Sequence, residues 1–490
     1  MVLLVGTAFL TSLSSCKKEL ANELTNDTYE DAFWKTESDV NAAVAGAYGL
    51  LRNSLNTNSC FFIWGDTPAG TFASSAGSLT TAVLGGDFKV PYRDEGAHNW
   101  TNWYKVVDLS NLIIENVQRM PDNLFNSKQS KNYLLGEAYF LRGLAYFYMT
   151  RTWGDVPLQL KATTSANVSE VKYIPATNTM DIIKQVIADG KKASSLLSWE
   201  GAGNYQKRRA SKGAALALLA HATAWKTPVG VWQNDNEQAV KYVDSILNRP
   251  DLFNLQPTDN IRKVFKNPGE PENIFVISAK DSENEGAAWT RNIWTANIAY
   301  VTLGSDVSSG SSNPHYFVDR LKIDELYEPD DTRIDDFYFV GKDVALLSKY
   351  SDVIFKGATA AGPTEPRAES NLIIFRLADM ILLKAECLNA MNRDIEAKTE
   401  LNKIRMRAGA SQITKVGLPL AHEILIERRR ELIGEGHNYF DMVRTGLFIQ
   451  IPWTMDNSRK AQKGYYWPVD NDILNANRFL NQIPYWNGKL

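Results

Sequence analysis

The chain has 490 residues, and its 53 lysine and arginine residues nearly balance 56 aspartate and glutamate residues, for a formal charge of −3. This balance, without any block of basic residues, argues against a nucleic-acid-binding protein. Three cysteines are too few for a disulfide scaffold in a chain of this length, and the hydrophobic fraction of 44% allows a large core.

The N-terminal residues up to Cys16 have the features of a lipoprotein signal peptide. The apolar run over residues 2–10 is too short to cross a bilayer as a helix. It leads into Leu13-Ser14-Ser15-Cys16, which resembles the lipobox at which bacterial lipoproteins are cleaved and acylated. We therefore expect residues 1–15 to be removed, and Cys16 to carry a lipid such as palmitate as the only membrane contact. The alternative is an apolar N-terminus without this role.

Helical periodicity then recurs through the N-terminal half of the chain. Apolar residues repeat at intervals of three and four over residues 39–51, 103–118, 131–151, 180–197, 211–226 and 237–247. Residues 131–151 carry two apolar stripes, which predicts a helix that packs between neighbours. Residues 211–226 are rich in alanine, so we expect a neighbouring helix to approach them closely.

Two long segments lack this periodicity and are predicted to be irregular. Glycine and proline interrupt residues 60–99, and residues 248–370 are rich in Gly, Asn, Asp, Pro and Ser. The apolar run at residues 274–277 predicts a short strand. Trp64-Gly65-Asp66 is a third candidate for ligand binding, but we interpret it as a turn that anchors the first segment. Long irregular segments within a helical scaffold commonly carry binding residues.

The C-terminal half returns to helical spacing over residues 379–391, 395–408 and 420–433. The first two form a pair that resembles a tetratricopeptide unit and ends at Gly409, as a helix C-cap favours. We therefore predict a mainly α protein, in which tetratricopeptide-like helical pairs carry a loop-rich irregular region with short strands. The expected regions are residues 16–247, with the inserted loop 60–99, and residues 248–490, with the loop-rich part 248–370 and helices over 371–446.

Several motifs occur in a fixed order along nearly the whole chain. They are the Cys16 signal and residues 137–142 (EAYFLR), 153–158 (WGDVPL), 427–432 (ERRREL) and 439–446 (YFDMVRTG). Together they resemble the SusD/RagB family, surface lipoproteins of Bacteroidetes that work with a TonB-dependent transporter in nutrient import. The resemblance implies a SusD-like protein of the outer membrane, facing the cell exterior, that binds a glycan and delivers it to a SusC-like TonB-dependent transporter. A peptide-binding member of the same family is the alternative.

Charged residues near the C-terminus could be mistaken for a catalytic acid/base pair. Glu427 and Glu431 lie four residues apart on one face of a predicted helix, among arginines that would keep both carboxylates ionised. A general acid instead requires a raised pKa. His437 is expected to pack or to form hydrogen bonds. The remaining histidines, which show no metal-ligand spacing, are His98, His221, His315 and His422.

From these patterns we predict no enzymatic activity, no cofactor and no catalytic or metal-ligating residues, and we leave a structural metal ion open. Two other classes of protein remain as alternatives. A surface glycoside hydrolase would also be an aromatic-rich lipoprotein, and it would use a pair of carboxylates. A helical scaffold for outer-membrane assembly would share the helical pairs but would not need the long aromatic segments.

The content of 13 tryptophans and 20 tyrosines exceeds what a helical scaffold requires. A sugar ring binds to flat aromatic faces, with amides, carboxylates or arginine for its hydroxyl groups. Residues 87–100 and 281–316 offer both. The candidate ligand-binding residues are Tyr92, Arg93, Asn99, Trp100, Trp289, Arg291, Trp294 and Tyr300. For each tryptophan the alternative is burial beneath its loop.

Overall fold

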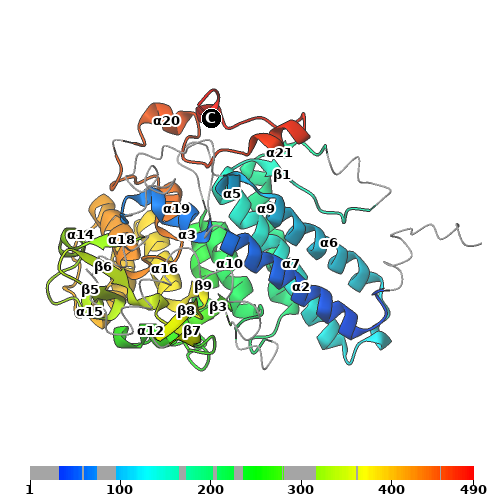
Figure 1. The fold of residues 1–490 in the computed structure, drawn as a ribbon, viewed down its shortest axis with the longest axis horizontal. Helices are drawn as coiled ribbons and strands as arrows, with labels where there is room; N and C mark the ends of the chain where they lie inside the picture. Colours follow the sequence, from blue (N-terminus) through cyan, green and yellow to red (C-terminus); the bar gives the residue numbers. More distant parts are fainter. Residues whose placement is uncertain are drawn as a thin grey trace, which may run out of the picture.

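The computed structural model describes residues 33–57, 60–73, 95–164, 173–201, 207–225, 235–278, 280, 316–359, 362–452 and 454–489. Over these residues the chain is mainly helical, with a few short strands (Figure 1). The predicted mainly α fold with short strands is therefore confirmed. The predicted signal peptide and Cys16 lie outside the described residues.

The six helices predicted in the N-terminal half are all present, with ends that differ by a few residues. They are α2 (Glu37–Asn56), α6 (Thr101–Arg119), α7 (Lys128–Trp153), α9 (Thr179–Leu196), α10 (Lys212–Ala224) and α11 (Asn236–Leu247). From α6 to α11 each of these helices packs on the one before it, and α2 packs on α6 and α7. Polar N-cap side chains explain where several begin. Thr36 and Ser127 form capping boxes at the starts of α2 and α7.

Helix α7 occupies the centre of this array, between α6 and α9, and both of its predicted apolar stripes are used. Nearly all of its side chains from Leu134 onward are buried. Small residues allow the helices to lie close together. A Cβ atom at Gly143 would lie 3.2 Å from the Asp189 side chain on α9, and one at Gly190 would lie 2.9 Å from Leu219 on α10. The predicted close packing of the alanine-rich helix is thus confirmed.

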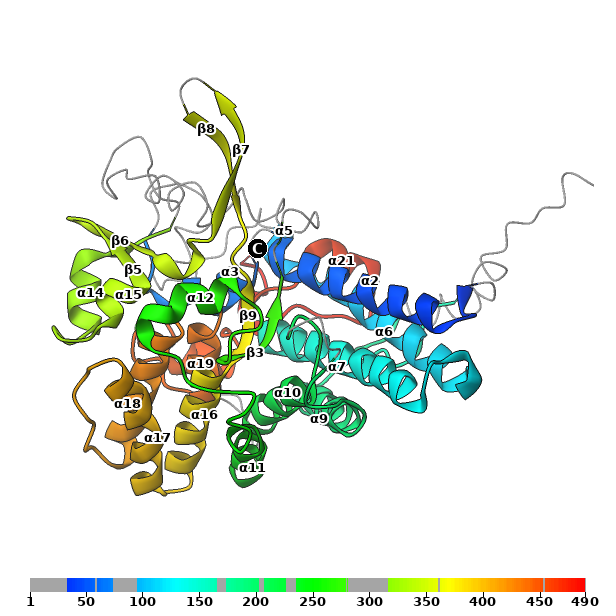
Figure 2. The ribbon, with the colours of Figure 1, turned by 90° about the horizontal axis from the view of Figure 1, so that it is seen from below.

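The C-terminal helices continue the same array. The predicted helices correspond to α16 (Leu377–Ala390), α17 (Asp394–Arg407) and α18 (Gly417–Glu431), and the chain then forms α19 (Asn438–Thr445). Helix α16 packs against α11 from the N-terminal half and against both α17 and α18, which gives one continuous set of helices (Figure 2). Gly409 follows α17 with a φ of +70°, as expected for a glycine after a helix end.

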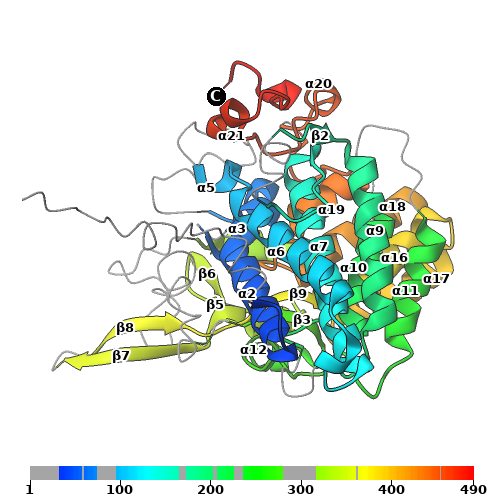
Figure 3. The ribbon, with the colours of Figure 1, turned by 90° about the vertical axis from the view of Figure 1, so that its right-hand side faces the viewer.

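The strands of the described residues form four short antiparallel sheets. Strand β3 (Asn273–Ile277) confirms the predicted strand and pairs antiparallel with β9 (Leu372–Arg376), and every residue of both is buried. Strands β4 (Val318–Asp319), β6 (Val344–Leu347) and β5 (Tyr338–Val340) form a small antiparallel sheet. Strands β7 (Val353–Thr359) and β8 (Gly362–Ala368) form a hairpin that projects from the body (Figure 3). A short pair, β1 (Val156–Pro157) with β2 (Ala176–Thr177), follows α7.

Two segments predicted to be irregular contain more structure than expected. Residues 60–73 form the buried helix α3 (Cys60–Gly65) and the 3-10 helix η2 (Thr67–Ala69), and α5 (Glu95–His98) precedes α6. The region 248–370 holds α12 (Ile261–Lys266), α14 (Arg320–Leu326) and α15 (Arg333–Phe337). The remaining short helices are η3 (Asp122–Leu124), η5 (Thr258–Asn260), η8 (Ser348–Tyr350), α20 (Asn457–Ala461), α21 (Asn471–Ala476) and η9 (Pro484–Trp486).

The helix α3 could not be recognised by periodicity because it is short and buried on all sides. In the sequence, Gly65 was interpreted as a break in the helical periodicity. In the structure it allows the backbone of α3 to lie close to the backbone at Gly436. A Cβ atom at Gly65 would lie 2.0 Å from the carbonyl oxygen of Gly436. No helix in the described ranges is both long and apolar enough to cross a membrane.

Candidate functional site

Two described residues at the ends of the segments predicted to bind a ligand are paired with each other. Ala73 pairs with Phe317 in an isolated antiparallel bridge, with N–O distances of 2.8 Å and 3.0 Å. Ala73 directly precedes the part of the first segment that lies outside the described residues, and Tyr316 directly follows the corresponding part of the second. The structure therefore brings together two chain positions that are far apart in the sequence. We call this pairing the loop base.

The loop base rests on a buried aromatic cluster. The ring of Phe62 on α3 lies 4.9 Å from Phe72 and 5.0 Å from Tyr316, both in edge-to-face contact. Tyr316 is only 7% exposed. Aromatic pairs in this geometry stabilise a fold beyond the area that they bury. The two ends are thus held by a shared part of the core rather than by a surface contact.

Residues of the C-terminal motif form hydrogen bonds to the chain just before the loop base. The Thr71 hydroxyl accepts hydrogen bonds from Arg429 Nε and Asn438 Nδ2, each at 3.0 Å. The backbone N–H of Gly436 donates to Asp66 Oδ2 at 2.6 Å. Burial raises the pKa of Asp66 to about 8, against the opposing effect of this hydrogen bond. The predicted turn at residues 64–66 is wrong for Trp64 and Gly65, which end α3, whereas the predicted anchoring role agrees with these contacts.

Two of the predicted ligand residues are described, and both have structural partners. Trp100 is 5% exposed, and its ring lies edge-to-face with Trp153 at 5.7 Å. Asn99 donates to Asp470 Oδ2 at 3.0 Å and accepts from the backbone N–H of Thr101 at 2.9 Å. A ring buried in this way offers no flat face to a sugar, so the prediction for Trp100 is corrected to a core role.

The other predicted ligand residues lie outside the described part of the chain and stay predictions: Tyr92, Arg93, Trp289, Arg291, Trp294 and Tyr300.

The carboxylates that resemble a catalytic pair are buried in a network of ion pairs. Glu431 contacts Arg376 at 2.7 Å, Arg407 at 2.5 Å and Arg333 at 3.1 Å. Burial alone would raise its pKa, but these guanidinium groups hold it well below the usual range. Glu427 has a lowered pKa for the same reason. Both carboxylates are fully buried and ionised, so the prediction that neither is a general acid is supported.

Three buried residues from distant parts of the chain could present ligand atoms to a metal ion. Nitrogen and oxygen atoms of His221, Asp379 and His437 lie within 4.8 Å of one another. His221 Nε2 is 2.7 Å from Asp379 Oδ2, and Asp379 Oδ1 also accepts from Arg428 at 2.8 Å. Ligand atoms at roughly 2.0–2.2 Å from one tetrahedral ion lie further apart than this hydrogen bond.

His221 of α10 and Asp379 of α16 are therefore joined by a hydrogen bond, and the ring of His437, just before α19, lies beside them. Burial lowers the pKa of His437 to about 4 and also lowers the pKa of His221, so both rings are neutral at neutral pH. Sequence spacing did not show this cluster, because only the tertiary fold brings its members together. The prediction that His437 packs or forms hydrogen bonds agrees with its position, since its ring stacks 6.0 Å from that of His221.

Comparison with known proteins gives consistent results over the whole chain. A family model described as "SusD family" matches residues 342–486, and one described as "Starch-binding associating with outer membrane" matches residues 20–223. SusD-like protein P38 of Formosa agariphila is 26% identical, and the alignment covers 96% of each chain. A SusD-like protein of Bacteroides ovatus is 25% identical over 95% of this chain and 85% of that protein.

Solved structures agree in fold. A SusD homolog from Bacteroides thetaiotaomicron superimposes with a TM-score of 0.75 at 22% identity, covering 92% of this chain and 98% of the other. A SusD superfamily protein from the same organism gives a TM-score of 0.70 at 25% identity, with coverages of 92% and 99%. B. fragilis NanU gives 0.73 at 23% identity, with coverages of 93% and 97%.

Proposed function

This chain belongs to the SusD/RagB family, and from that premise we propose that it binds a glycan and delivers it to a TonB-dependent transporter of the outer membrane. The observation that supports the glycan site most directly is the pairing of Ala73 with Phe317. It joins the two chain segments that carry the aromatic and polar residues a sugar requires.

The same proposal makes the protein a binding protein and not an enzyme. Glycoside hydrolysis uses two carboxylates on either side of the scissile bond, one of which must be protonated. Glu427 and Glu431 are buried and hold lowered pKa values, so neither can reach a glycan or donate a proton. Both carboxylates instead form buried ion pairs with arginine side chains.

Attachment to the outer membrane would come from acylation of Cys16, with the protein facing the cell exterior. The sequence Leu13-Ser14-Ser15-Cys16, which resembles a lipobox, supports this proposal. The family model described as starch-binding and associated with the outer membrane agrees with this location. The partner would be a SusC-like transporter, and a peptide in place of the glycan is the second ligand class.

The partner can be tested without knowing the ligand. The native lipoprotein would be solubilised from outer membranes in mild detergent, isolated, and its stoichiometric partner identified by mass spectrometry. We expect a TonB-dependent transporter. Recovery of the lipoprotein alone, or with outer-membrane assembly proteins, would contradict delivery to a transporter.

The ligand class can be tested by binding of the purified chain to panels of glycans and peptides. We expect binding to a glycan that is lost in Trp289→Ala and Trp294→Ala and retained in Tyr242→Ala, a half-buried aromatic residue on α11 that serves as the control. Binding to peptides alone would favour the second ligand class. Release of shorter products from a glycan would support the hydrolase alternative.

A further inference from the structure

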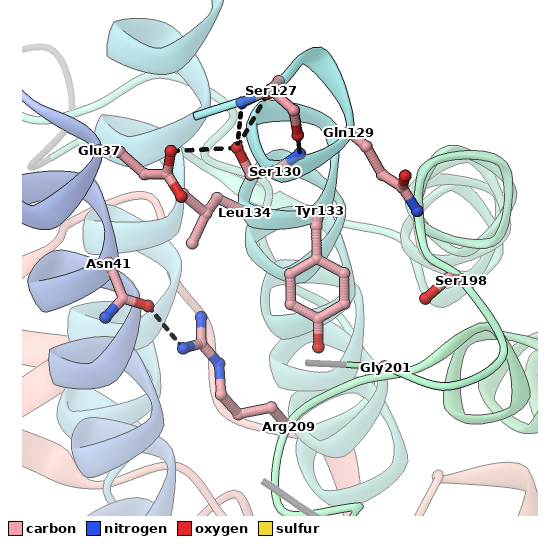
Figure 4. A pocket seen from close by; sticks show the side chains of 10 residues that line it. All are labelled: Glu37, Asn41, Ser127, Gln129, Ser130, Tyr133, Leu134, Ser198, Gly201 and Arg209. Carbon is pink, nitrogen blue, oxygen red and sulfur yellow. Dashed lines mark hydrogen bonds between the residues drawn. The ribbon is translucent and has the colours of Figure 1, made fainter. Parts of the chain in front are cut away.

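A hollow of about 370 Å³ lies between α2, the start of α7 and the segment that precedes α10 (Figure 4). Its volume is within the range of roughly 300–1,000 Å³ that small-molecule sites occupy. The residues that line it are Glu37, Asn41, Ser127, Gln129, Ser130, Tyr133, Leu134, Ser198, Gly201 and Arg209. The lining combines hydroxyl, amide, carboxylate and guanidinium groups with one aromatic ring.

The hollow is separate from the loop base. It lies at the beginning of α2, whereas the end of α2 leads into α3 beneath the loop base. A helix of 20 residues is roughly 30 Å long. The hollow and the loop base therefore lie near opposite ends of α2.

The floor of the hollow is a guanidinium group whose charge is already neutralised. Arg209 is 6% exposed, and its Nε donates to Glu137 Oε1 at 2.6 Å. Its Nη1 donates to Asn41 Oδ1 at 2.6 Å, which fixes the Asn41 amide at the wall of the hollow (Figure 4). Glu137 is completely buried and also accepts from Tyr48 at 2.9 Å. The guanidinium is thus held rigidly and does not require an anionic ligand.

The two side walls are held equally firmly. Glu37 on α2 accepts from the Ser130 hydroxyl on α7 at 3.0 Å, and Ser130 Oγ accepts from the backbone N–H of Ser127 at 3.1 Å. The Tyr133 hydroxyl donates to Ala210 O at 2.8 Å, which fixes the aromatic ring along the hollow beside Leu134 (Figure 4). An aromatic ring next to fixed hydrogen-bonding groups is the combination that a sugar ring recognises, through its C–H face and its hydroxyl groups.

Some of the lining groups retain unused hydrogen-bonding capacity. Neither the Gln129 amide, the Ser198 hydroxyl nor Asn41 Nδ2 makes a hydrogen bond to any residue in the ranges that the structure describes. A purely apolar ligand would leave such groups unpaired, at a cost in free energy. An anionic ligand would meet the Glu37 carboxylate while Arg209 is already paired with Glu137. A neutral ligand with several hydroxyl groups avoids both penalties.

We propose that this hollow is a second saccharide site, which binds one neutral sugar residue independently of the two long segments. The proposal extends the glycan-binding function and rests on it only for the chemical class of the ligand. Two separated sites on one chain would let it hold a polysaccharide at two points, which raises avidity without a stronger contact at either point.

The test uses saturation-transfer NMR of the full chain with the methyl glycosides of glucose, galactose and mannose. Ser198→Trp would fill the hollow, and Ser245→Trp, at an exposed position on α11, is the matched control. We expect a signal for at least one glycoside, at least roughly tenfold weaker in Ser198→Trp and unchanged in Ser245→Trp. Gln129→Ala, at an exposed position on α7, removes one hydrogen bond and is expected to weaken binding roughly fivefold.

The outcomes separate this proposal from the glycan function of the long segments. If no glycoside gives a signal, or the signal persists in Ser198→Trp and Gln129→Ala, the second site is refuted. If Trp289→Ala and Trp294→Ala abolish polysaccharide binding while the glycoside signal stays, the two sites are independent, as proposed. If those two variants also remove the glycoside signal, the hollow is not a separate site. A glycoside signal without any polysaccharide binding would retain the hollow and refute the wider function.

Discussion

Replacement of Arg376 by methionine tests whether the buried ion network holds the C-terminal layer together. Arg376 ends β9, is 1% exposed, and lies among three buried carboxylates. Its Nη1 is 2.6 Å from Glu272 and 2.7 Å from Glu431, and its Nε is 2.7 Å from Glu435. Methionine keeps an unbranched side chain in the core but removes the charge and every donor.

The expected loss follows from the partners that remain. Breaking a buried ion pair by removing one partner costs about 3–5 kcal/mol, because the other charge stays buried without compensation. Here Glu431 keeps Arg407, and Glu435 keeps Lys349 at 2.6 Å. The three carboxylates therefore do not each incur the full penalty. We expect Arg376→Met to lower the free energy of unfolding by about 3–5 kcal/mol in total.

The measurement is the free energy of urea unfolding, monitored both by circular dichroism and by tryptophan fluorescence. The matched control is Arg393→Met, which removes an ion pair with Glu396 whose side chains are 38% and 55% exposed. Exposed pairs contribute at most about 1 kcal/mol. If the two variants lose the same free energy of unfolding, the argument that burial makes the Arg376 network important is refuted.

Three further predictions follow from single residues. Gly65→Ala would place a methyl group 2.0 Å from Gly436 O, so we expect a lower melting temperature and loss of glycan binding, whereas Gly49→Ala, with nothing within 4 Å, should be neutral or stabilising. Equal melting temperatures would show that the close approach is unimportant. Trp100→Ala should cost about 3–5 kcal/mol in urea unfolding and leave the glycan affinity of the folded protein unchanged; a selective loss of affinity would restore its ligand role. Because burial raises the pKa of Asp66 from 3.8 to about 8, its contribution to stability is complete below the lower value and is lost as the pH rises through the upper one. We therefore expect Asp66→Asn to gain stability relative to the wild type as the pH rises from about 4 to about 8. A difference in the free energy of unfolding that stays constant over this range would contradict the prediction.

The positions of the long helices were predictable because helix formation is local. Apolar residues three and four positions apart mark the buried side of a helix, whereas the starts of α2 and α7, set by the caps Thr36 and Ser127, were predicted a few residues too late. A short apolar run identified the strand β3, and the alanine content of residues 211–226 indicated the close packing of α10. Short buried elements such as α3 carry no such period, and there the spacing of glycines was misleading.

The charge state of the C-terminal carboxylates was also predictable, but their partners were not. The arginines near Glu431 in the sequence indicated that it would be ionised. Only the fold showed that Arg333, Arg376 and Arg407 neutralise it, while the adjacent Arg428 turns to Asp379. Residues separated by many positions acquire a fixed distance only when the layers pack. Local spacing contains no information about such distances.

The sequence by itself therefore determined the helical architecture, the family and the expectation of a binding protein, because each depends on local periodicity or on motifs that stand in order along the chain. The tertiary structure decided that Ala73 meets Phe317, that Trp100 belongs to the core, and that a polar hollow forms beside Tyr133. These features depend on which surfaces are buried against each other. That choice is made by the packing of the whole chain and not by any one segment of it.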